Sequence, residues 1–239
     1  MSRPTPAVLA MSGRGELPYA LLHRVPLFLH ALRALAASGD HVLLVVVDQD
    51  DRERVTHEVR RAGIEADVRA GDDWWQRVHE VGIGTTGLLV HDALCPLTST
   101  GFIRAVRRSA AEQSEASWLA YRPVTDTVKT VVDERIQATI DREQLAALVS
   151  PVVVSAEVLS GAVASGEPPP VEDFARLADW LRHRGQVRLL RAPSLARRVD
   201  DASAVNLLEC VDEIARTVRR GPGARGDVAV TDAAGPGIP

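Results

Sequence analysis

The chain contains almost no lysine. Lys129 is the single lysine among 239 residues, and the other 27 of its 28 basic residues are arginines. Any chemistry that needs two lysine side chains is therefore excluded. An arginine bias of this kind is typical of a GC-rich coding genome.

Cysteines and long apolar runs are scarce as well. Cys95 and Cys210 are isolated, with no CxxC pair, so neither a zinc knuckle nor a disulfide framework is indicated. We interpret both as small buried apolar residues. No segment reaches the roughly 20 apolar residues of a membrane span, and residues 1–13 lack the apolar run and the flanks of a signal peptide. We expect a cytoplasmic protein that does not contact membranes.

Charges of the two signs nearly balance. The 28 basic and 32 acidic residues give a formal net charge of −4 and an isoelectric point of about 6.0, which provides no electrostatic basis for nucleic-acid binding. With 46% hydrophobic and 25% charged residues, the chain is of the globular class. We predict one domain over 1–220 and a disordered tail over 221–239, where neither a helical nor a strand period is present.

Hydrophobic periodicity alternates between strand and helix along the chain. Continuous β-branched runs such as 41–48 are typical of parallel strands that are buried on both faces, and residues 26–37 have apolar side chains at helical spacing. We predict strands over 6–11, 41–48, 66–69, 86–92, 117–124, 151–155 and 187–191, and helices over 26–37, from Asp50 or Asp51 to Ala62, from Asp72 or Asp73 onward, and over 98–111, 156–165, 171–184 and 201–220. This order predicts an α/β fold with one doubly wound, mostly parallel sheet.

Residues 125–141 have a different hydrophobic pattern. Apolar and polar residues alternate there with period two around Asp133-Glu134, which predicts a β-hairpin.

Ligands of doubly wound sheets bind outside the carboxyl ends of the strands. The loop Ser12-Gly13-Arg14-Gly15 follows the first predicted strand, and its backbone N–H groups and single guanidinium suit a triphosphate. It is neither a Walker loop nor a GxGxxG loop, so a plain turn is the alternative. Asp92 ends another buried strand, where a carboxylate can hold a divalent metal or a ribose hydroxyl; the alternative is a helix cap. For Asp72, which follows Gly71, we favour the role of a helix cap over ligand binding.

Trp74 and Trp75 are adjacent near the start of a predicted helix. Two indole rings can stack on a nucleobase, but we favour the alternative that they form a hydrophobic patch, which either closes a pocket or packs on the helix.

Three segments carry a resemblance to a known family. The runs LLVHDALCPLTS (88–99), RPVTDTVKTV (122–131) and TIDREQLAALVSPVVV (139–154) resemble the VHDAARPL, PVTDTIK and T-x-[DN]-R-x-x-L-x-x-x-x-T-P-Q-x-F segments of 2-C-methyl-D-erythritol 4-phosphate cytidylyltransferases. Order and spacing agree from about residue 5 to 217.

The resemblance implies a Rossmann-like fold of the nucleotidyltransferase type. Its hairpin arm, here 125–141, exchanges with a second subunit in a homodimer. It also implies that 2-C-methyl-D-erythritol 4-phosphate, a phosphorylated polyol, attacks the α-phosphate of CTP, with Mg²⁺ bridging the phosphates and pyrophosphate leaving.

The resemblance further implies roles for individual residues. Asp92 would lie near the metal and the sugar, and Thr139 and Arg142 would contact the substrate phosphate across the dimer. The residues that would meet the nucleotide are Ala10, Ser12, Gly13, Gly71, Asp72 and Ala93.

The sequence also departs from the family pattern. Tyr19 stands at or beside the position of a lysine that contacts the triphosphate, and Cys95 replaces the arginine of HDAARP. The family's D-N-I-K-V-T becomes 195–200, which loses a metal-binding aspartate and places Arg198 at a second lysine. Arg14 and Arg198 are the best-placed substitutes for the missing catalytic cations. Because one preorganised donor at a developing oxyanion contributes about 2.7–4 kcal/mol, we expect weak or altered cytidylyl transfer; the alternative is a non-catalytic dimeric paralogue with a binding or regulatory role.

Overall fold

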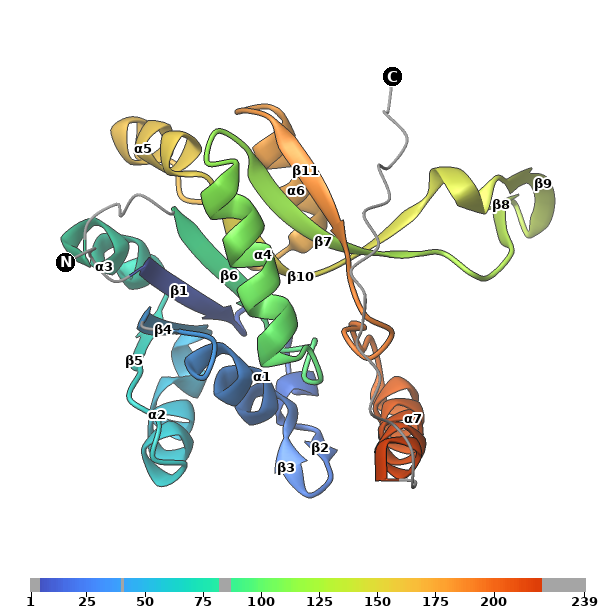
Figure 1. The fold of residues 1–239 in the computed structure, drawn as a ribbon, viewed down its shortest axis with the longest axis horizontal. Helices are drawn as coiled ribbons and strands as arrows, with labels where there is room; N and C mark the ends of the chain where they lie inside the picture. The colour runs from blue at the N-terminus through green and yellow to red at the C-terminus, as the bar shows by residue number, and fades with distance from the viewer. Residues whose placement is uncertain (1–4, 40, 82–86, 221–239) are drawn as a thin grey trace.

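The computed structural model describes residues 5–39, 41–81 and 87–220. At its centre lies a seven-stranded sheet with the strand order β11-β7-β10-β6-β1-β4-β5 (Figure 1). Neighbouring strands among β6, β1, β4 and β5 pair in parallel, whereas β10 is antiparallel to both β6 and β7. The predicted Rossmann-like, mostly parallel α/β fold is confirmed. The strands of the sheet are β1 (Thr5–Ala10), β4 (His41–Val47), β5 (Asp67–Ala70), β6 (Leu88–Asp92), β7 (Ser117–Pro123), β10 (Ala146–Val154) and β11 (Val187–Arg191).

Helices pack on both faces of this sheet. One hydrophobic cluster joins it to α1 (Leu27–Ala36), α2 (Arg52–Arg61) and α4 (Thr100–Glu112), and a second joins it to α3 (Asp73–Val81), α5 (Ala156–Ser165) and α6 (Phe174–Arg182). Along β1, Ala7 and Leu9 enter the first cluster and Val8 and Ala10 the second. Because side chains alternate between the faces of a strand, a strand covered on both faces must be apolar throughout.

The C-terminal helix α7 (Ala202–Arg220) packs on a small hairpin formed by β2 (Leu21–Leu22) and β3 (Val25–Pro26). At the tip of this hairpin, the backbone N–H of His23 donates to the Glu209 carboxylate at 2.7 Å, and the His23 ring lies 3.0 Å from the Asp212 carboxylate. The sequence patterns did not predict this hairpin. The 3₁₀ turns are η1 (Leu17–Tyr19), η2 (Gln49–Asp51) and η3 (Arg142–Gln144).

Most predicted elements lie within two residues of the observed ones, with two larger differences. Strand β10 begins at Ala146 rather than at 151, and α6 begins at Phe174 rather than at 171. Helix α6 starts late because the Asp173 carboxylate accepts hydrogen bonds from the backbone N–H groups of Ala175 and Arg176, as an N-cap does. The predicted tail over 221–239 lies outside the described residues.

The hairpin predicted over 125–141 is confirmed. Strands β8 (Val128–Val132) and β9 (Arg135–Ile140) pair antiparallel around Asp133 and Glu134, whose φ angles of 49° and 61° are those of a tight two-residue turn. The hairpin protrudes from the body of the molecule (Figure 1). We call β8, β9 and their turn the arm.

No helix within residues 5–39, 41–81 and 87–220 is both long and apolar enough to cross a membrane.

Candidate functional site

The carboxyl ends of β1 and β6 meet at the middle of the sheet. Ala10, the last residue of β1, pairs with Asp92, the last residue of β6. The backbone N–H of Ala93 donates to the Ala10 carbonyl at 3.1 Å, and the N–H of Ser12 donates to the carbonyl of Val46 at 3.0 Å. These bonds fix the first residues of both loops, so the side chains that follow are positioned by the sheet.

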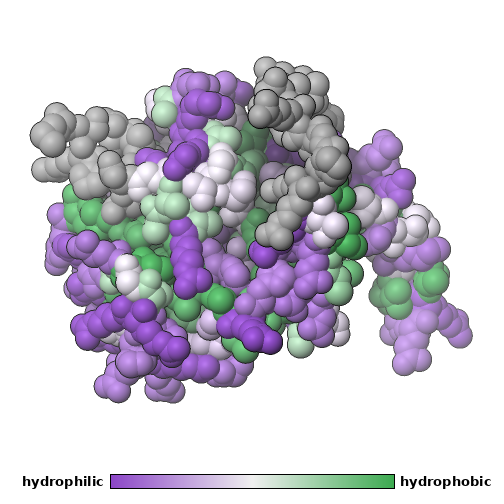
Figure 2. Space-filling model, turned by 60° about the horizontal axis from the view of Figure 1, so that its bottom comes forward, coloured by the Kyte–Doolittle hydropathy of each residue, from purple (hydrophilic) through white to green (hydrophobic). Residues whose placement is uncertain are grey.

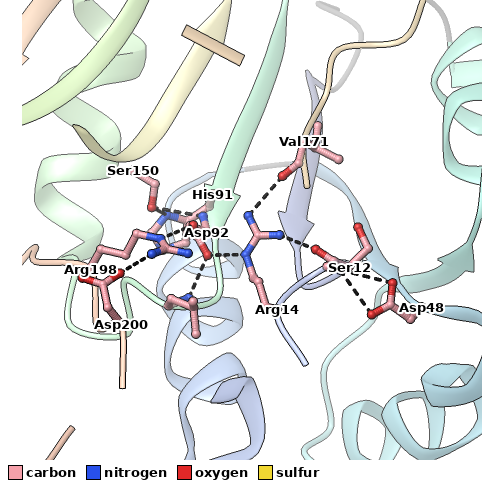
Figure 3. A network of polar contacts seen from close by, with 11 residues as sticks. Ser12, Arg14, Asp48, His91, Asp92, Ser150, Val171, Arg198 and Asp200 are labelled. Atoms are coloured by element: carbon pink, nitrogen blue, oxygen red, sulfur yellow. Dashed lines mark hydrogen bonds and ion pairs between the residues drawn. The ribbon is translucent and has the colours of Figure 1, made fainter. Parts of the chain in front are cut away.

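Asp92 lies at the centre of a charged network (Figure 3). Its Oδ1 accepts from Arg14 Nε at 2.7 Å and from the Leu94 backbone N–H at 2.9 Å, and its Oδ2 accepts from Arg198 Nε at 3.1 Å. The Asp92 side chain is only 1% exposed. Burial alone would raise the pKa of this carboxyl, but Arg14, the Leu94 backbone N–H and Arg198 together outweigh that effect and hold the pKa below its usual range. Asp92 is therefore ionised and shared between two cations.

Arg14 reaches Asp92 from the loop after β1 and is itself buried. Besides its bond to Asp92, it donates from Nη1 to the Ser12 carbonyl at 2.6 Å and from Nη2 to the Val171 carbonyl at 3.1 Å. Its guanidinium carbon also lies 5.8 Å from the centre of the Phe174 ring. All three guanidinium nitrogens thus bind the protein, and Arg14 joins the loop to Asp92 and to the segment before α6.

Arg198 reaches Asp92 from the loop between β11 and α7. The N–H of Val199 donates to the Leu94 carbonyl at 2.8 Å, which anchors this loop beside Asp92. The Arg198 side chain is 35% exposed and also pairs with the more exposed carboxylate of Asp200. Of the two arginines, Arg198 is the one that solvent can reach.

Behind Asp92 lies a second polar group. The Ser150 hydroxyl accepts from the Asp92 backbone N–H at 3.0 Å and lies 2.7 Å from Nδ1 of His91. Complete burial lowers the pKa of His91 to about 4 and raises the pKa of the Cys95 thiol to about 12, so both are uncharged at neutral pH. Cys95 is buried as predicted; the same prediction is wrong for Cys210, which is exposed because it lies on the outer face of α7.

The loop amide at Gly13 has an anionic partner within the chain. Its N–H lies 3.2 Å from both carboxylate oxygens of Asp48, at the end of β4. Gly13 has φ +72°, and an added Cβ would lie 3.4 Å from the Cβ of Glu172. The loop therefore presents an N–H that binds an anionic oxygen, and glycine is needed there.

Two neighbours of this loop were not among the predicted site residues. Arg54, in the first turn of α2, stacks its guanidinium 3.6 Å from the centre of the Tyr19 ring and pairs with Glu16 at 3.2 Å. Asp48 follows a buried strand just as Asp92 does, so the signal that indicated Asp92 also indicates Asp48. Arg54 has no such signal because it faces the loop only after α2 has folded back.

Other predicted site residues lie apart from this network. Gly71 and Asp72 are exposed at the end of the edge strand β5, which β4 separates from β1. Thr139 is exposed near the end of β9, and Arg142 is exposed in η3 just beyond the arm, where it donates to the Thr125 carbonyl at 2.8 Å. Within one chain, none of these four residues hydrogen-bonds or pairs with Asp92 in the part of the chain that the structure describes.

The paired tryptophans belong to the core. Trp74 and Trp75 are 4% and 6% exposed and pack in the second hydrophobic cluster, with their ring centres 5.5 Å apart. This geometry favours the packing interpretation.

The donor set around Asp92 does not fit a divalent cation. Both carboxylate oxygens are used by guanidinium or backbone N–H groups. Among the described residues, no three His, Cys, Asp or Glu side chains gather as a metal site would require. The metal role predicted for Asp92 has no support in this geometry.

The fold and the network define an α/β protein with an arginine-carboxylate site at the carboxyl ends of its central parallel strands. The family model for 2-C-methyl-D-erythritol 4-phosphate cytidylyltransferase (IspD) matches residues 12–206. The chain therefore belongs to this family, which confirms the resemblance seen in its motifs.

Individual relatives agree with this assignment. The 2-C-methyl-D-erythritol 4-phosphate cytidylyltransferase of Corynebacterium diphtheriae is 27% identical over 202 residues, which are 75% of this chain and 82% of the relative. A bifunctional IspD/IspF enzyme of Solidesulfovibrio magneticus is 33% identical over 67% of this chain and 42% of its own length. The crystal structure of 4-diphosphocytidyl-2C-methyl-D-erythritol synthase from Anaerococcus prevotii matches 88% of this chain and 96% of that chain, with 13% identity and a TM-score of 0.64. This last similarity supports the fold.

Proposed function

We propose that this chain binds CTP at the carboxyl ends of β1 and β6 around Asp92, which we call the Asp92 edge. It then transfers the cytidylyl group to 2-C-methyl-D-erythritol 4-phosphate, a step of isoprenoid synthesis, at a low rate. Membership of the family supports the reaction. The observation that carries it to this site is the pair of arginines, Arg14 and Arg198, fixed on Asp92 at the ends of β1 and β6. The cytoplasmic location expected from the sequence stays a prediction.

In this reaction an oxygen of the acceptor phosphate attacks the α-phosphorus of CTP. A new P–O bond forms, the bond between the α-phosphorus and the bridging oxygen breaks, and pyrophosphate leaves with the electron pair. Negative charge grows on the leaving group, so a fixed cation beside it lowers the barrier. Arg198 is suited to this role because Asp92 holds its Nε, Nη1 pairs with the exposed Asp200, and Nη2 has no hydrogen-bond partner among the described residues. Arg14 is a positioning residue, because it shapes the loop from a buried site.

The acceptor phosphate is assigned to the arm of a second copy of the chain. Thr139, in β9, and Arg142, in the adjoining turn η3, are exposed and carry a hydroxyl and a guanidinium, both phosphate-binding groups. The arm also exposes Val131, Val132 and Ile136 at 59%, 48% and 64%, and Figure 2 shows hydrophobic side chains on it at the right of the view. Apolar residues on a protruding hairpin favour a homodimer in which each arm packs on the other copy.

A specific observation also favours the second candidate, a non-catalytic paralogue. The Gly13 N–H is used by Asp48, and the Arg14 guanidinium is used by Asp92 and two carbonyls. Donors that relatives would offer to a triphosphate are here bound within the chain. On this second proposal the dimer binds a ligand or a partner but does not turn over.

Calorimetry with CTP, followed by an assay for pyrophosphate release with 2-C-methyl-D-erythritol 4-phosphate, distinguishes the two candidates. The enzyme proposal requires CTP binding and pyrophosphate release that falls when Arg198 is replaced by alanine. The matched control is Arg182→Ala, an exposed arginine on α6 that pairs only with Asp179 among the described residues. Binding without pyrophosphate release would support the paralogue. Failure to bind CTP would reject nucleotide binding at this edge.

A further inference from the structure

The carboxylate of Asp92 has no free position for a cation. Oδ1 has two N–H donors, from Arg14 at 2.7 Å and Leu94 at 2.9 Å, and Oδ2 accepts from Arg198 at 3.1 Å. A divalent ion would have to displace a guanidinium from a side chain that is 1% exposed. The displaced Arg14 would remain a buried cation without its partner, which is costly.

Neighbouring groups do not supply the missing ligands. The nearby carboxylates of Asp48 and Asp200 bind the Gly13 N–H and Arg198, respectively, and the described part of the chain holds no cluster of three metal-ligating side chains. Two guanidinium groups already lie against Asp92, so a divalent ion there would also be repelled by like charge. Cations of the protein occupy the position in which a metal would be bound.

Arg198 keeps capacity for an outside anion. It uses Nε for Asp92 and Nη1 for Asp200, and its Nη2 has no hydrogen-bond partner among the described residues. The side chain is 35% exposed, and Asp200 is exposed enough, at 71%, to turn into solvent. A guanidinium held in this way can bind two phosphate oxygens in a fork.

We infer that Asp92 is the counter-ion of Arg14 and Arg198 rather than a metal ligand, and that the site binds the oligophosphate of a nucleotide through Arg198 without a divalent cation. This inference rests on the proposed function for the identity of the ligand. The part of the inference that assigns Asp92 as a counter-ion also applies to the protein without nucleotide and can be tested on it.

The first test is calorimetry of the wild-type protein with CTP, in excess Mg²⁺ and in excess EDTA. The two dissociation constants should agree within about threefold, a difference below 1 kcal/mol. Arg198→Ala should weaken binding by about tenfold or more in both buffers, the effect of one charge-assisted hydrogen bond, and Arg182→Ala should leave it unchanged. Loss of CTP binding in EDTA would overturn the inference.

The second test uses Mn²⁺ and the protein without nucleotide. It tests whether Asp92 is a metal ligand even where CTP does not bind in either buffer. Electron paramagnetic resonance should detect no stoichiometric Mn²⁺ on the wild-type chain. Asp92→Asn should lower the melting temperature much more than Asp179→Asn, which alters an exposed Asp–Arg pair with a similar distance of 2.9 Å. One tightly bound Mn²⁺ that disappears in Asp92→Asn would overturn the inference. If Asp92→Asn does not fold, the wild-type Mn²⁺ titration alone remains decisive for the claim that Asp92 is not a metal ligand. Failure of CTP binding would reject the proposed function and nucleotide binding through Arg198, but not that claim.

Discussion

The Asp92 edge and the arm contrast in what holds them in place. At the carboxyl ends of β1 and β6, polar groups from four distant segments bind one another, and Arg14 alone joins its own loop to two of the others. In the arm, residues 129–139 are all exposed, and the two strands are joined chiefly by their own backbone pairing. The Asp92 site is therefore held together by contacts within one chain, whereas most side chains of the arm are exposed and available for contact with another molecule.

The largest effect is expected from Arg14→Met. This change leaves part of the Asp92 charge unpaired in the interior and removes the bonds to Ser12 and Val171, so the free energy of unfolding should fall by about 3–5 kcal/mol. Arg182→Met removes an exposed pair and should cost about 1 kcal/mol or less. Urea unfolding measures both. Equal effects of the two changes would contradict the structural role of the edge.

A pH effect of similar size is expected from His91, whose pKa is lowered from 6.5 to about 4 by burial. Between these values the unfolded chain binds a proton that the folded chain does not, so stability falls as the pH drops from 6.5 to 4, by at most about 3 kcal/mol. Asp92 has a lowered pKa, so its contribution persists over this range and is lost only below its ordinary value of 3.8. Urea unfolding at pH 7 and pH 5 checks the first window. His91→Asn should flatten that dependence, and an unchanged slope in this variant would assign it to other groups.

A smaller effect is expected from Gly13→Ala. An alanine at φ +72° should cost about 1–2 kcal/mol, and its methyl group would press on Glu172. Gly161→Ala, inside α5 with nothing within 4 Å of the added Cβ, should instead stabilise the chain by about 0.5–1 kcal/mol. Thermal unfolding of the two variants should therefore shift in opposite directions. A higher melting temperature in Gly13→Ala as well would show that the loop is free to change its conformation.

The smallest effect on stability, and the sharpest test of the comparison, is expected in the arm. Ile136→Ser should change the free energy of unfolding of the single chain by less than about 0.5 kcal/mol, because the side chain is 64% exposed. In the proposed dimer the same side chain is buried, so sedimentation velocity should show weaker association. A marked loss of single-chain stability without any change in association would mean that the arm folds back on its own chain.

Sequence patterns predicted the sheet well because β1, β4 and β6 are buried on both faces and read as continuous apolar runs. They also located Asp92, since a polar residue directly after such a run lies at the edge of the sheet. The sequence also singled out Arg14 and Arg198 as site residues, but it did not predict that both bind Asp92 or that Arg14 also binds the Val171 carbonyl. The Val171 carbonyl, which belongs to an irregular segment after three prolines, has no side-chain signature at all. The late start of α6 was also missed, because the Asp173 carboxylate caps the helix so that it begins three residues later than hydrophobic spacing suggests.

The network at Asp92 also has a consequence for the order of folding. Arg14 lies 78 positions from Asp92 and 157 positions from Val171, and Arg198 lies 106 positions from Asp92. Contacts over such separations form late, because the loops between them must close first. During synthesis, the segment around Arg14 must wait until Val171 and Phe174 have emerged before its last partners are present. The loop after β1 is thus among the first parts to be made and among the last to reach its final conformation.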